Sequence, residues 1–375
     1  MTKKLAKLLI VSMCMTLLTS CWDSKDINKK SIALSIGVDY VNDNIEFTGE
    51  IAKLTSSDEE KVKTSDVYKM LSYGKTFEEC RKNYDSVNPF SVFLGATRIV
   101  VFGENYAKRG IEPYLNRIDH LYDYRKTILT VVTREKPREL FNVKVDKDIC
   151  VGFLIEDIME HVAGKGEGLY PVTGELLSDI KLGKIGYLLP YVGIEKGSIK
   201  YLGLAAMKNS KLVGIINIKD TDGIMYVLAE KPRIVQIIDR GDNGKNKISF
   251  RTIVNKREIK ADYVHNKVKI NIDLELKAQL RYQYYMKPIS DEYTKKLENI
   301  ISEKVKNNIE SVIKRSQKEF ECDIFGFARY FRAKKPEIYK KINWEDGFRE
   351  ADVEVNVKTK ITNKTLTDPN AKEKY

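Results

Sequence analysis

One side chain in this sequence has surroundings that point to a specific covalent chemistry, the thiol of Cys21. It follows a basic start with three lysines and an apolar run from Leu8 to Leu18. That run has about eleven residues, within the ~7–15 residues of a signal-peptide core and short of the roughly 20 that span a bilayer. The segment Leu18-Thr19-Ser20-Cys21 then matches the lipobox of bacterial lipoprotein signals.

Each part of the lipobox has a chemical reason. The thiol accepts a diacylglyceryl group, and small residues precede it because the processing peptidase has a tight cleft. An ordinary signal peptide, or a buried N-terminal helix with an incidental cysteine, is the alternative interpretation. The position of Cys21 directly after a basic and an apolar segment favours the lipoprotein. We therefore predict a signal peptide over residues 1–20 and a mature chain held on the outer surface of a membrane by two acyl chains, which bind stably where one binds only marginally.

Residues that could support catalysis are scattered along the rest of the chain. The three histidines, His120, His161 and His265, lie far apart without metal-ligand spacing, and the sequence has no H-E-x-x-H or G-x-S-x-G motif. Most carboxylates are interleaved with lysines. A catalytic pair could still form through the fold, but the sequence favours a protein that is not an enzyme and that holds no cofactor or metal.

The remaining cysteines give no framework for a disulfide or a metal site. Cys14 leaves with the signal and Cys21 is predicted to be lipidated, which leaves Cys80, Cys150 and Cys322 at wide spacing. An odd number of distant cysteines predicts no disulfide pattern. We expect buried free thiols at these three positions.

A glycine-rich stretch, Gly164 to Gly168, has a superficial likeness to a phosphate-binding loop. It follows a predicted helix instead of a strand, and it lacks the Lys-Ser/Thr ending of a P-loop. We expect a flexible turn there and no bound nucleotide.

The chain has more basic than acidic residues, and this excess is spread along its whole length. The formal net charge is +12, and the three lysines of the signal leave about +9 on the mature chain. Acidic residues are interspersed throughout, so the charge fits a surface that faces anionic lipid better than a nucleic-acid-binding stripe. Export also argues against a nucleic-acid partner.

The length of the mature chain, 355 residues, suggests two or three domains. We predict an α+β protein of about three subdomains with antiparallel sheets and a long C-terminal amphipathic helix. The composition of the segment Pro190–Lys200 is typical of a boundary between domains. The predicted division is an N-terminal α/β domain over 21–197 and a C-terminal α+β domain over 198–375, with a polar tail from about 363.

The N-terminal part alternates between strand and helix patterns, which argues for a mixed α/β domain. Thr76 and Glu79 have the spacing of a capping box, and Phe77, Cys80, Arg81 and Tyr84 then fall on one helical stripe. The other expected elements are a hairpin over Ile32–Val38 and Ile45–Leu54, a loop over Thr55–Thr64, strands over Thr97–Phe102 and Thr127–Thr133, and helices over Asn105–Arg109 and Pro113–Leu121.

The C-terminal part has its clearest signals in one strand and one helix. Val268 to Leu276 alternates apolar and polar residues with the period of a half-buried strand, and Ser290 and Asp291 cap a long helix. The apolar stripe of that helix is usually core packing, and a partner-binding groove is the alternative. The other expected elements are two strands within Tyr201–Ile218, a polar loop over Gly241–Lys247, a meander over Ile248–Val254, Glu258–Tyr263 and Lys267–Tyr282, and a last strand over Ala351–Ile361; the helix stripe holds Leu297, Ile301, Val305, Ile309, Val312 and Ile313.

Two stretches resemble the C-subunit family of spore germinant receptors, the GerAC-like lipoproteins. The first is Cys21-Trp22-Asp23-Ser24-Lys25-Asp26-Ile27, in which Asp26 stands where the family usually has Glu, followed by the strand that ends in Ile36-Gly37-Val38-Asp39. The second holds Phe325-Gly326-Phe327, Lys335-Pro336, Trp344 and Phe348. Gly74-Lys75-Thr76-Phe77-Glu78 is similar to a family segment between them. The aromatic residues of the second stretch are expected to be core.

The resemblance implies a mixed α/β fold of about three domains and a non-catalytic receptor subunit. Such a subunit sits on the outer surface of the spore inner membrane and works with two integral-membrane partners, the A and B subunits, in the germination response to nutrients. No residue is assigned to nutrient contact. The alternative is a lipid-anchored solute-binding protein of a transporter, although the meander and the long helix fit its two-lobed plan poorly.

Overall fold

The computed structural model describes residues 29–53, 67–121, 123–146, 148–239, 246–285 and 289–363. The predicted signal, Cys21, Trp22, the Thr55–Thr64 loop, most of the 241–247 loop and the tail from 364 lie outside these residues. Within them, no helix is both long enough and apolar enough to cross a membrane.

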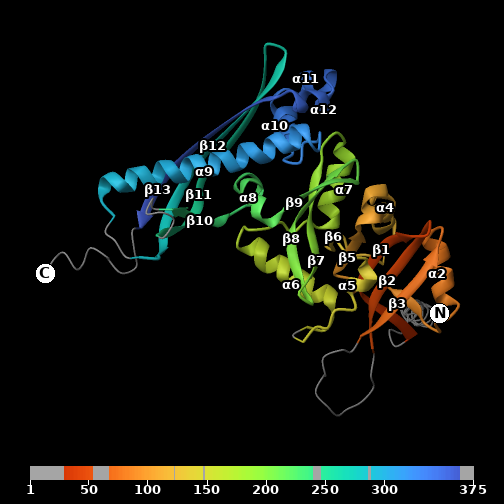
Figure 1. Ribbon diagram of the computed structural model, residues 1–375. Helices are drawn as coiled ribbons and strands as arrows, with labels where there is room; N and C mark the ends of the chain where they lie inside the picture. Colours follow the sequence, from red (N-terminus) through yellow and green to blue (C-terminus); the bar gives the residue numbers. More distant parts are fainter. Residues whose placement is uncertain are drawn as a thin grey trace, which may run out of the picture.

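Two sheets form the framework (Figure 1). The first has the strand order β3-β2-β1-β5-β6-β7-β8-β9, with β4 paired to β1, and its centre is parallel, from β1 through β5 and β6 to β7. Its strands are β1 (Lys30–Val41), β2 (Asn44–Ala52), β3 (Val67–Gly74), β4 (Ser91–Phe93), β5 (Ile99–Gly103), β6 (Leu129–Thr133), β7 (Tyr187–Glu195), β8 (Ser198–Lys208) and β9 (Lys211–Asn217).

Helices cover both faces of this sheet, because its central strands are apolar on both sides. In β5, Ile99 and Val101 belong to one hydrophobic cluster, whereas Val100 and Phe102 belong to the other. The first cluster includes residues of α5 (Pro137–Leu140) and α6 (Val151–Gly164); the second includes residues of α2 (Phe77–Asp85), α3 (Glu104–Arg109), α4 (Glu112–His120) and α7 (Thr173–Leu182).

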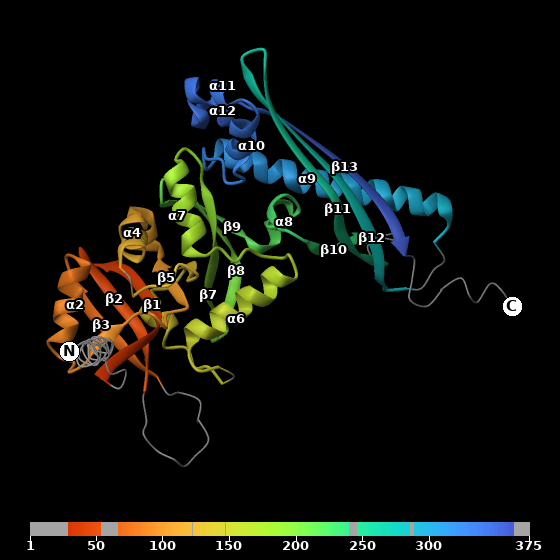
Figure 2. The ribbon, with the colours of Figure 1, turned by 180° about the vertical axis from the view of Figure 1, so that it is seen from behind.

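The second sheet has the order β10-β11-β12-β13, and α9 (Asp291–Lys318) lies across it (Figure 2). The predicted stripe of α9 is buried at all six positions, so core packing is confirmed. In β12 the predicted alternation is also confirmed, since every second residue from Val268 to Leu276 is buried. The strands are β10 (Arg233–Asp239), β11 (Lys247–Val264), β12 (Lys267–Gln283) and β13 (Asp352–Asn363).

One predicted break in the meander is wrong. Ile248–Val254 and Glu258–Tyr263 are not two strands but parts of one strand, β11, which pairs with β12 along its length. The pairing register shifts between Val254 and Lys256, so a bulge carries the polar residues that resembled a turn. The third strand of the meander is β10, which the sequence reading missed.

The segment expected to separate two domains, Pro190–Lys200, forms the turn end of the β7–β8 hairpin inside the first sheet. Hydrogen bonding therefore crosses residue 197, while the division into domains there stays a prediction. The two sheets meet through α8 (Asp222–Leu228), where a methyl group on Gly223 would lie 2.4 Å from the backbone oxygen of Asn308 in α9. One hydrophobic cluster contains residues of both sheets, so their cores are continuous.

Three short helices close the chain before β13. They are α10 (Phe327–Lys334), α11 (Pro336–Lys341) and α12 (Trp344–Arg349), and they pack near the hairpin that joins β11 and β12. The elements together confirm the predicted α+β class.

Candidate membrane-proximal site

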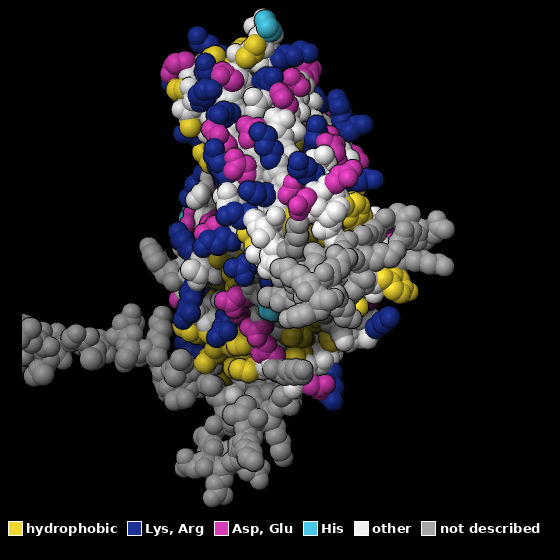
Figure 3. Space-filling model, turned by 90° about the vertical axis from the view of Figure 1, so that its left-hand side faces the viewer, with side chains coloured by type: hydrophobic (Ala, Val, Ile, Leu, Met, Phe, Trp, Pro, Cys, Tyr) yellow, Lys and Arg dark blue, Asp and Glu magenta, His cyan; other side chains and the backbone are white. Residues whose placement is uncertain are grey.

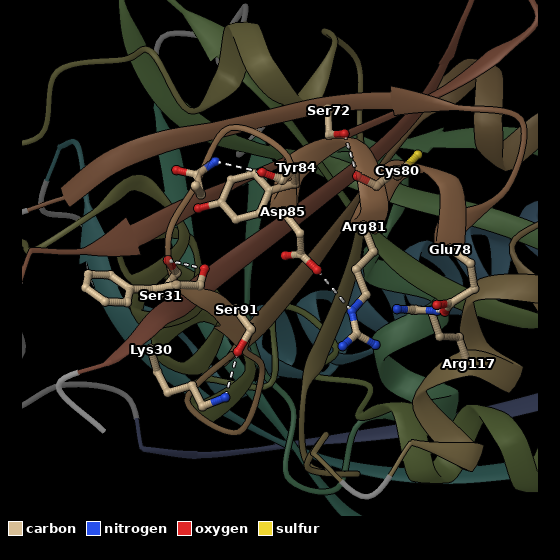
Figure 4. A network of polar contacts seen from close by, with 12 residues as sticks. Lys30, Ser31, Ser72, Glu78, Cys80, Arg81, Tyr84, Asp85, Ser91 and Arg117 are labelled. Carbon is tan, nitrogen blue, oxygen red and sulfur yellow. Dashed lines mark hydrogen bonds and ion pairs between the residues drawn. The ribbon is translucent and has the colours of Figure 1, made fainter. Parts of the chain in front are cut away.

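The start of β1 is the described segment nearest in sequence to the predicted lipid anchor. Eight residues separate Cys21 from Lys30, where β1 begins. Strand β4 runs parallel to this end of β1, with Lys30 opposite Ser91 and Ile32 opposite Phe93. The first residue of β1 therefore lies beside the loop that follows α2 (Figure 4).

Three polar contacts fix the first residues of β1. The Lys30 ammonium donates to the Ser91 hydroxyl at 2.6 Å, and the Ser31 hydroxyl donates to the backbone oxygen of Phe90 at 3.2 Å. The hydroxyl of Tyr68 in β3 donates to the Ser31 oxygen at 3.1 Å. Because these contacts tie β1 to both β3 and β4, the first residues of β1 are held firmly in the sheet.

Helix α2 packs beside these contacts and begins as predicted. The Thr76 hydroxyl accepts the backbone N–H of Glu79 at 3.1 Å, which confirms the capping residue. Cys80 and Tyr84 are buried on the expected stripe, but Arg81 is exposed and pairs with Asp85 at 3.7 Å. Arg81 therefore lies at the solvent edge of the stripe, where its guanidinium pairs with Asp85 one turn along the helix.

A buried carboxylate organises the same end of the sheet. Glu50 is fully buried on β2, and it accepts hydrogen bonds from the backbone N–H groups of Val151 and Gly152 at 3.0 and 2.8 Å. It also accepts the Ser35 hydroxyl at 2.5 Å and the Lys69 ammonium at 2.6 Å. The carboxylate thus satisfies the free N–H groups at the start of α6 and complements its helix dipole. Sequence reasoning missed this role, and the only signal was a glutamate within an apolar strand.

The motif at the end of β1 has a structural role. Asp39 is buried, and its Oδ1 accepts the backbone N–H groups of Tyr40 at 2.8 Å and of Tyr106 in α3 at 3.2 Å. Burial raises the pKa of Asp39 despite these bonds. A methyl group on Gly103 would lie 2.3 Å from the Asp39 carboxyl carbon, and one on Gly37 would lie 2.4 Å from Pro137 Cβ. Both glycines therefore permit a close approach.

The C-terminal motif is core, as predicted. Asp323 is buried, and its carboxylate accepts the backbone N–H groups of Phe327 at 3.1 Å and of Ala328 at 2.8 Å, at the start of α10. It also accepts the indole N–H of Trp344 at 3.1 Å. Gly326 has φ 68°, the left-handed conformation that precedes this helix. The four aromatic residues expected to be core, Phe325, Phe327, Trp344 and Phe348, are all buried.

A cavity of about 500 Å³ lies beside the start of β7 in the first sheet. It is lined by residues of α7, the start of β7, the segment after α8 and the start of α10. Arg329 forms an ion pair with Asp179 there, and burial raises the pKa of Asp179 even beside this cation. Gly168 also lines the cavity; Gly164 is the last residue of α6, and the stretch after it turns, as predicted.

The residues considered for catalysis or metal binding stay apart. His120 is on α4, His161 on α6 and His265 at the tip of the β11–β12 hairpin, all exposed. In the part of the chain that the structure describes, no group of three His, Cys, Asp or Glu side chains could hold a metal ion. Cys80, Cys150 and Cys322 are free and buried, which confirms that prediction.

Two family models match consecutive parts of this chain. The spore germination protein N-terminal domain matches residues 23–194, and the C-terminal domain described as spore germination B3/GerAC-like matches residues 202–365. The chain belongs to the GerAC-like family of spore germination proteins.

Several spore germination proteins align with this member of the GerAC-like family over nearly their whole length. Spore germination protein B3 of Bacillus subtilis (strain 168) is 23% identical over 96% of this chain and 98% of its own. Spore germination protein A3 of the same organism is 23% identical over 94% of this chain and 96% of its own. The crystal structure of the GerBC protein superposes with a TM-score of 0.59 at 21% identity, over 91% of this chain and all of that one, and so shares the fold.

These matches bear on the alternative of a transporter's solute-binding protein. The GerAC-like family models and the relatives named above give it no support. Cys21 lies just before the matched residues, and it is outside the residues that the structure describes, so its lipidation stays a prediction.

Proposed function

We propose that this protein is the lipid-anchored, non-catalytic C subunit of a nutrient germinant receptor, required for spore germination in response to nutrients. The observation that carries the proposal is the pair of family models, which match residues 23–194 and 202–365 in the order of the chain. The subunit acts by binding and not by making or breaking bonds.

The proposed location is the outer surface of the spore inner membrane, with Cys21 as the lipidated residue. The lipobox and the short tether support this location. Eight residues separate Cys21 from the start of β1, and Lys30 and Ser31 hold this strand to its neighbours. The body of the protein would therefore lie within eight residues of sequence of the proposed anchor.

The proposed partners are the integral-membrane A and B subunits of the same receptor. A subunit that transmits a signal between partners should be stiff, and the continuous core between the two sheets supports this role. Its surface suits polar contacts: on the face in Figure 3, Lys and Arg side chains are interspersed with Asp and Glu. Such a surface favours orientation and specificity over large apolar burial.

Co-purification tests the proposed assembly. The protein is tagged at its C-terminus and isolated from spore membranes in mild detergent, and its partners are identified by mass spectrometry. We expect a multi-span receptor protein and a permease-like protein, encoded by neighbouring genes. Recovery of an ATPase and a transport permease would contradict the proposal. A deletion strain whose spores germinate normally in every nutrient tested would also count against it.

A further inference from the structure

The loop that joins α2 to β4 exposes apolar side chains in an ordered setting. Val87 is 76% exposed and Phe90 is 41% exposed, and Pro89 between them is also exposed. We call these three residues the apolar loop. Single exposed apolar residues are common on protein surfaces, so exposure alone would not indicate a partner.

The polar side chains of the same loop form hydrogen bonds to the backbone of α2. The Ser86 hydroxyl donates to the backbone oxygen of Asn83 at 2.7 Å, and the Asn88 amide donates to the backbone oxygen of Tyr84 at 3.1 Å. The backbone N–H of Val87 donates to that same oxygen at 3.1 Å. The hydroxyl of Ser86 and the amide of Asn88 are therefore engaged by the protein's own backbone, while the neighbouring apolar side chains of Val87, Pro89 and Phe90 are exposed without such partners.

The loop is also fixed at its far end. The Ser31 hydroxyl donates to the Phe90 oxygen, and the Lys30 ammonium donates to the Ser91 hydroxyl (Figure 4). The exposed apolar side chains are therefore held on a rigid support, so little conformational entropy is lost when they are buried against another surface.

The position of the apolar loop indicates that it would face the membrane. Lys30 is the Cα partner of Ser91, directly after the loop. The stretch back to Cys21 spans at most about 30 Å when extended. A lipid on Cys21 would thus keep the loop within reach of the bilayer surface.

The charges around the loop are complementary to anionic lipid. Lys29 and Lys82 are exposed beside it, and Lys30 is half-buried against Ser91. The nearby acid, Asp85, is paired with Arg81. Lysines next to an apolar wedge are the usual composition of interfacial membrane contacts.

We propose that the apolar loop is a second membrane contact, in which Val87, Pro89 and Phe90 enter the headgroup layer of an anionic bilayer beside the lipid anchor. The inference rests on the proposed anchored function and adds a defined orientation: the α2 end of the first sheet faces the membrane, and the second sheet projects away from it.

Vesicle binding tests this contact without the lipid. The mature chain with Cys21→Ser is mixed with vesicles of phosphatidylcholine alone or with about one third phosphatidylglycerol, and bound protein is measured by flotation. The test variant carries Val87→Ser and Phe90→Ser. The matched control carries Val235→Ser and Ile237→Ser, which are comparably exposed on β10; circular dichroism checks that both variants fold.

We expect the parent and the control to bind the anionic vesicles, and the test variant to bind roughly tenfold or more weakly, because two apolar side chains no longer leave water. A second variant, Phe90→Trp, should show a blue shift of its fluorescence when anionic vesicles are added. Equal binding by the test variant and the parent would overturn the proposal.

Other outcomes are equally decisive. Equal losses in the test and control variants would also overturn it, because the loop would then have no special role. In a third outcome, the parent binds neither kind of vesicle, and the test variant loses receptor partners in the co-purification. The loop would then be a protein contact, and the proposal would be wrong. Because the vesicle assay uses unlipidated protein, its failure is separate from failure of the anchor at Cys21.

Discussion

The carboxylate of Asp323 and the indole of Trp344 are joined by a hydrogen bond of 3.1 Å across 21 residues of sequence. The same carboxylate receives two backbone N–H groups at the start of α10. The two ends of the C-terminal motif are therefore one buried unit that holds α10 and α12 together. This relationship explains why the motif has an acidic residue upstream of its aromatic residues.

Replacing Trp344 with Phe should destabilise the fold. The change removes a donor from a buried carboxylate and leaves a small cavity, so we expect a loss of about 2–4 kcal/mol in the free energy of unfolding. Urea denaturation followed by circular dichroism measures the loss. Tyr330→Phe, at an exposed position of α10, serves as the control and should change little. A Trp344→Phe protein as stable as its parent would contradict the assigned role of the indole.

Replacing Glu50 with Ala should be more costly than removing its cation. The change leaves two helix N–H groups, the Ser35 hydroxyl and the Lys69 ammonium without their acceptor. Loss of one partner of a buried pair costs roughly 3–5 kcal/mol. Lys69→Met should cost less, because Lys69 is partly exposed and Glu50 keeps its other donors. Denaturation of the two single variants compares them, and a larger effect for Lys69→Met would refute this account.

A methyl group at Gly37 should be poorly tolerated. In Gly37→Ala the new carbon would lie 2.4 Å from Pro137 Cβ and 2.7 Å from Thr48 Cγ2, and overpacking of this kind costs about 1–3 kcal/mol. The control is Gly164→Ala at the end of α6, where nothing lies within 4 Å of the added carbon. Thermal melts should show a lower Tm for the first variant and an equal or higher Tm for the second. Equal melting temperatures for both would show that α5 moves aside freely.

The three buried thiols should be unreactive in the folded protein. Burial raises the pKa of Cys80 to about 11 and that of Cys322 to about 12, and it raises the pKa of Cys150 as well. The reactive species is the thiolate. At a pH below these raised pKa values, the thiols stay neutral. With the Cys21→Ser mature chain at pH 8, Ellman's reagent should detect almost no thiol before denaturation and three per chain after it. Rapid reaction of a native thiol would indicate an opening near it.

Local patterns predicted the elements whose burial repeats regularly. The stripe of α9 and the alternation of β12 follow from neighbouring residues alone, and both are found. Strand β10 was missed because Val235 and Ile237 are apolar on its exposed face, which hides the alternation. The bulge in β11 was missed because its polar residues resemble a turn.

Contacts between distant segments could not be read from the sequence. The donors to Glu50 come from positions 35, 69, 151 and 152, so no regular spacing along the chain predicts them. The apolar loop gave no signal either, because the hydrogen bonds of Ser86 and Asn88 to the backbone of α2 form only in the folded chain. The family motifs were recognisable, but their bonds, such as that from Trp344 to Asp323, required the structure.

The most direct test of the central claim is the location of a Cys21→Ala protein in spores. The variant and the parent are expressed at equal levels in a strain without the native gene, and the inner-membrane and soluble fractions are assayed by immunoblot while germination is followed by loss of optical density. The account predicts that Cys21→Ala moves to the soluble fraction and that nutrient germination is weakened. A variant that stays on the membrane and supports full germination would show that the lipid is dispensable and would contradict the account.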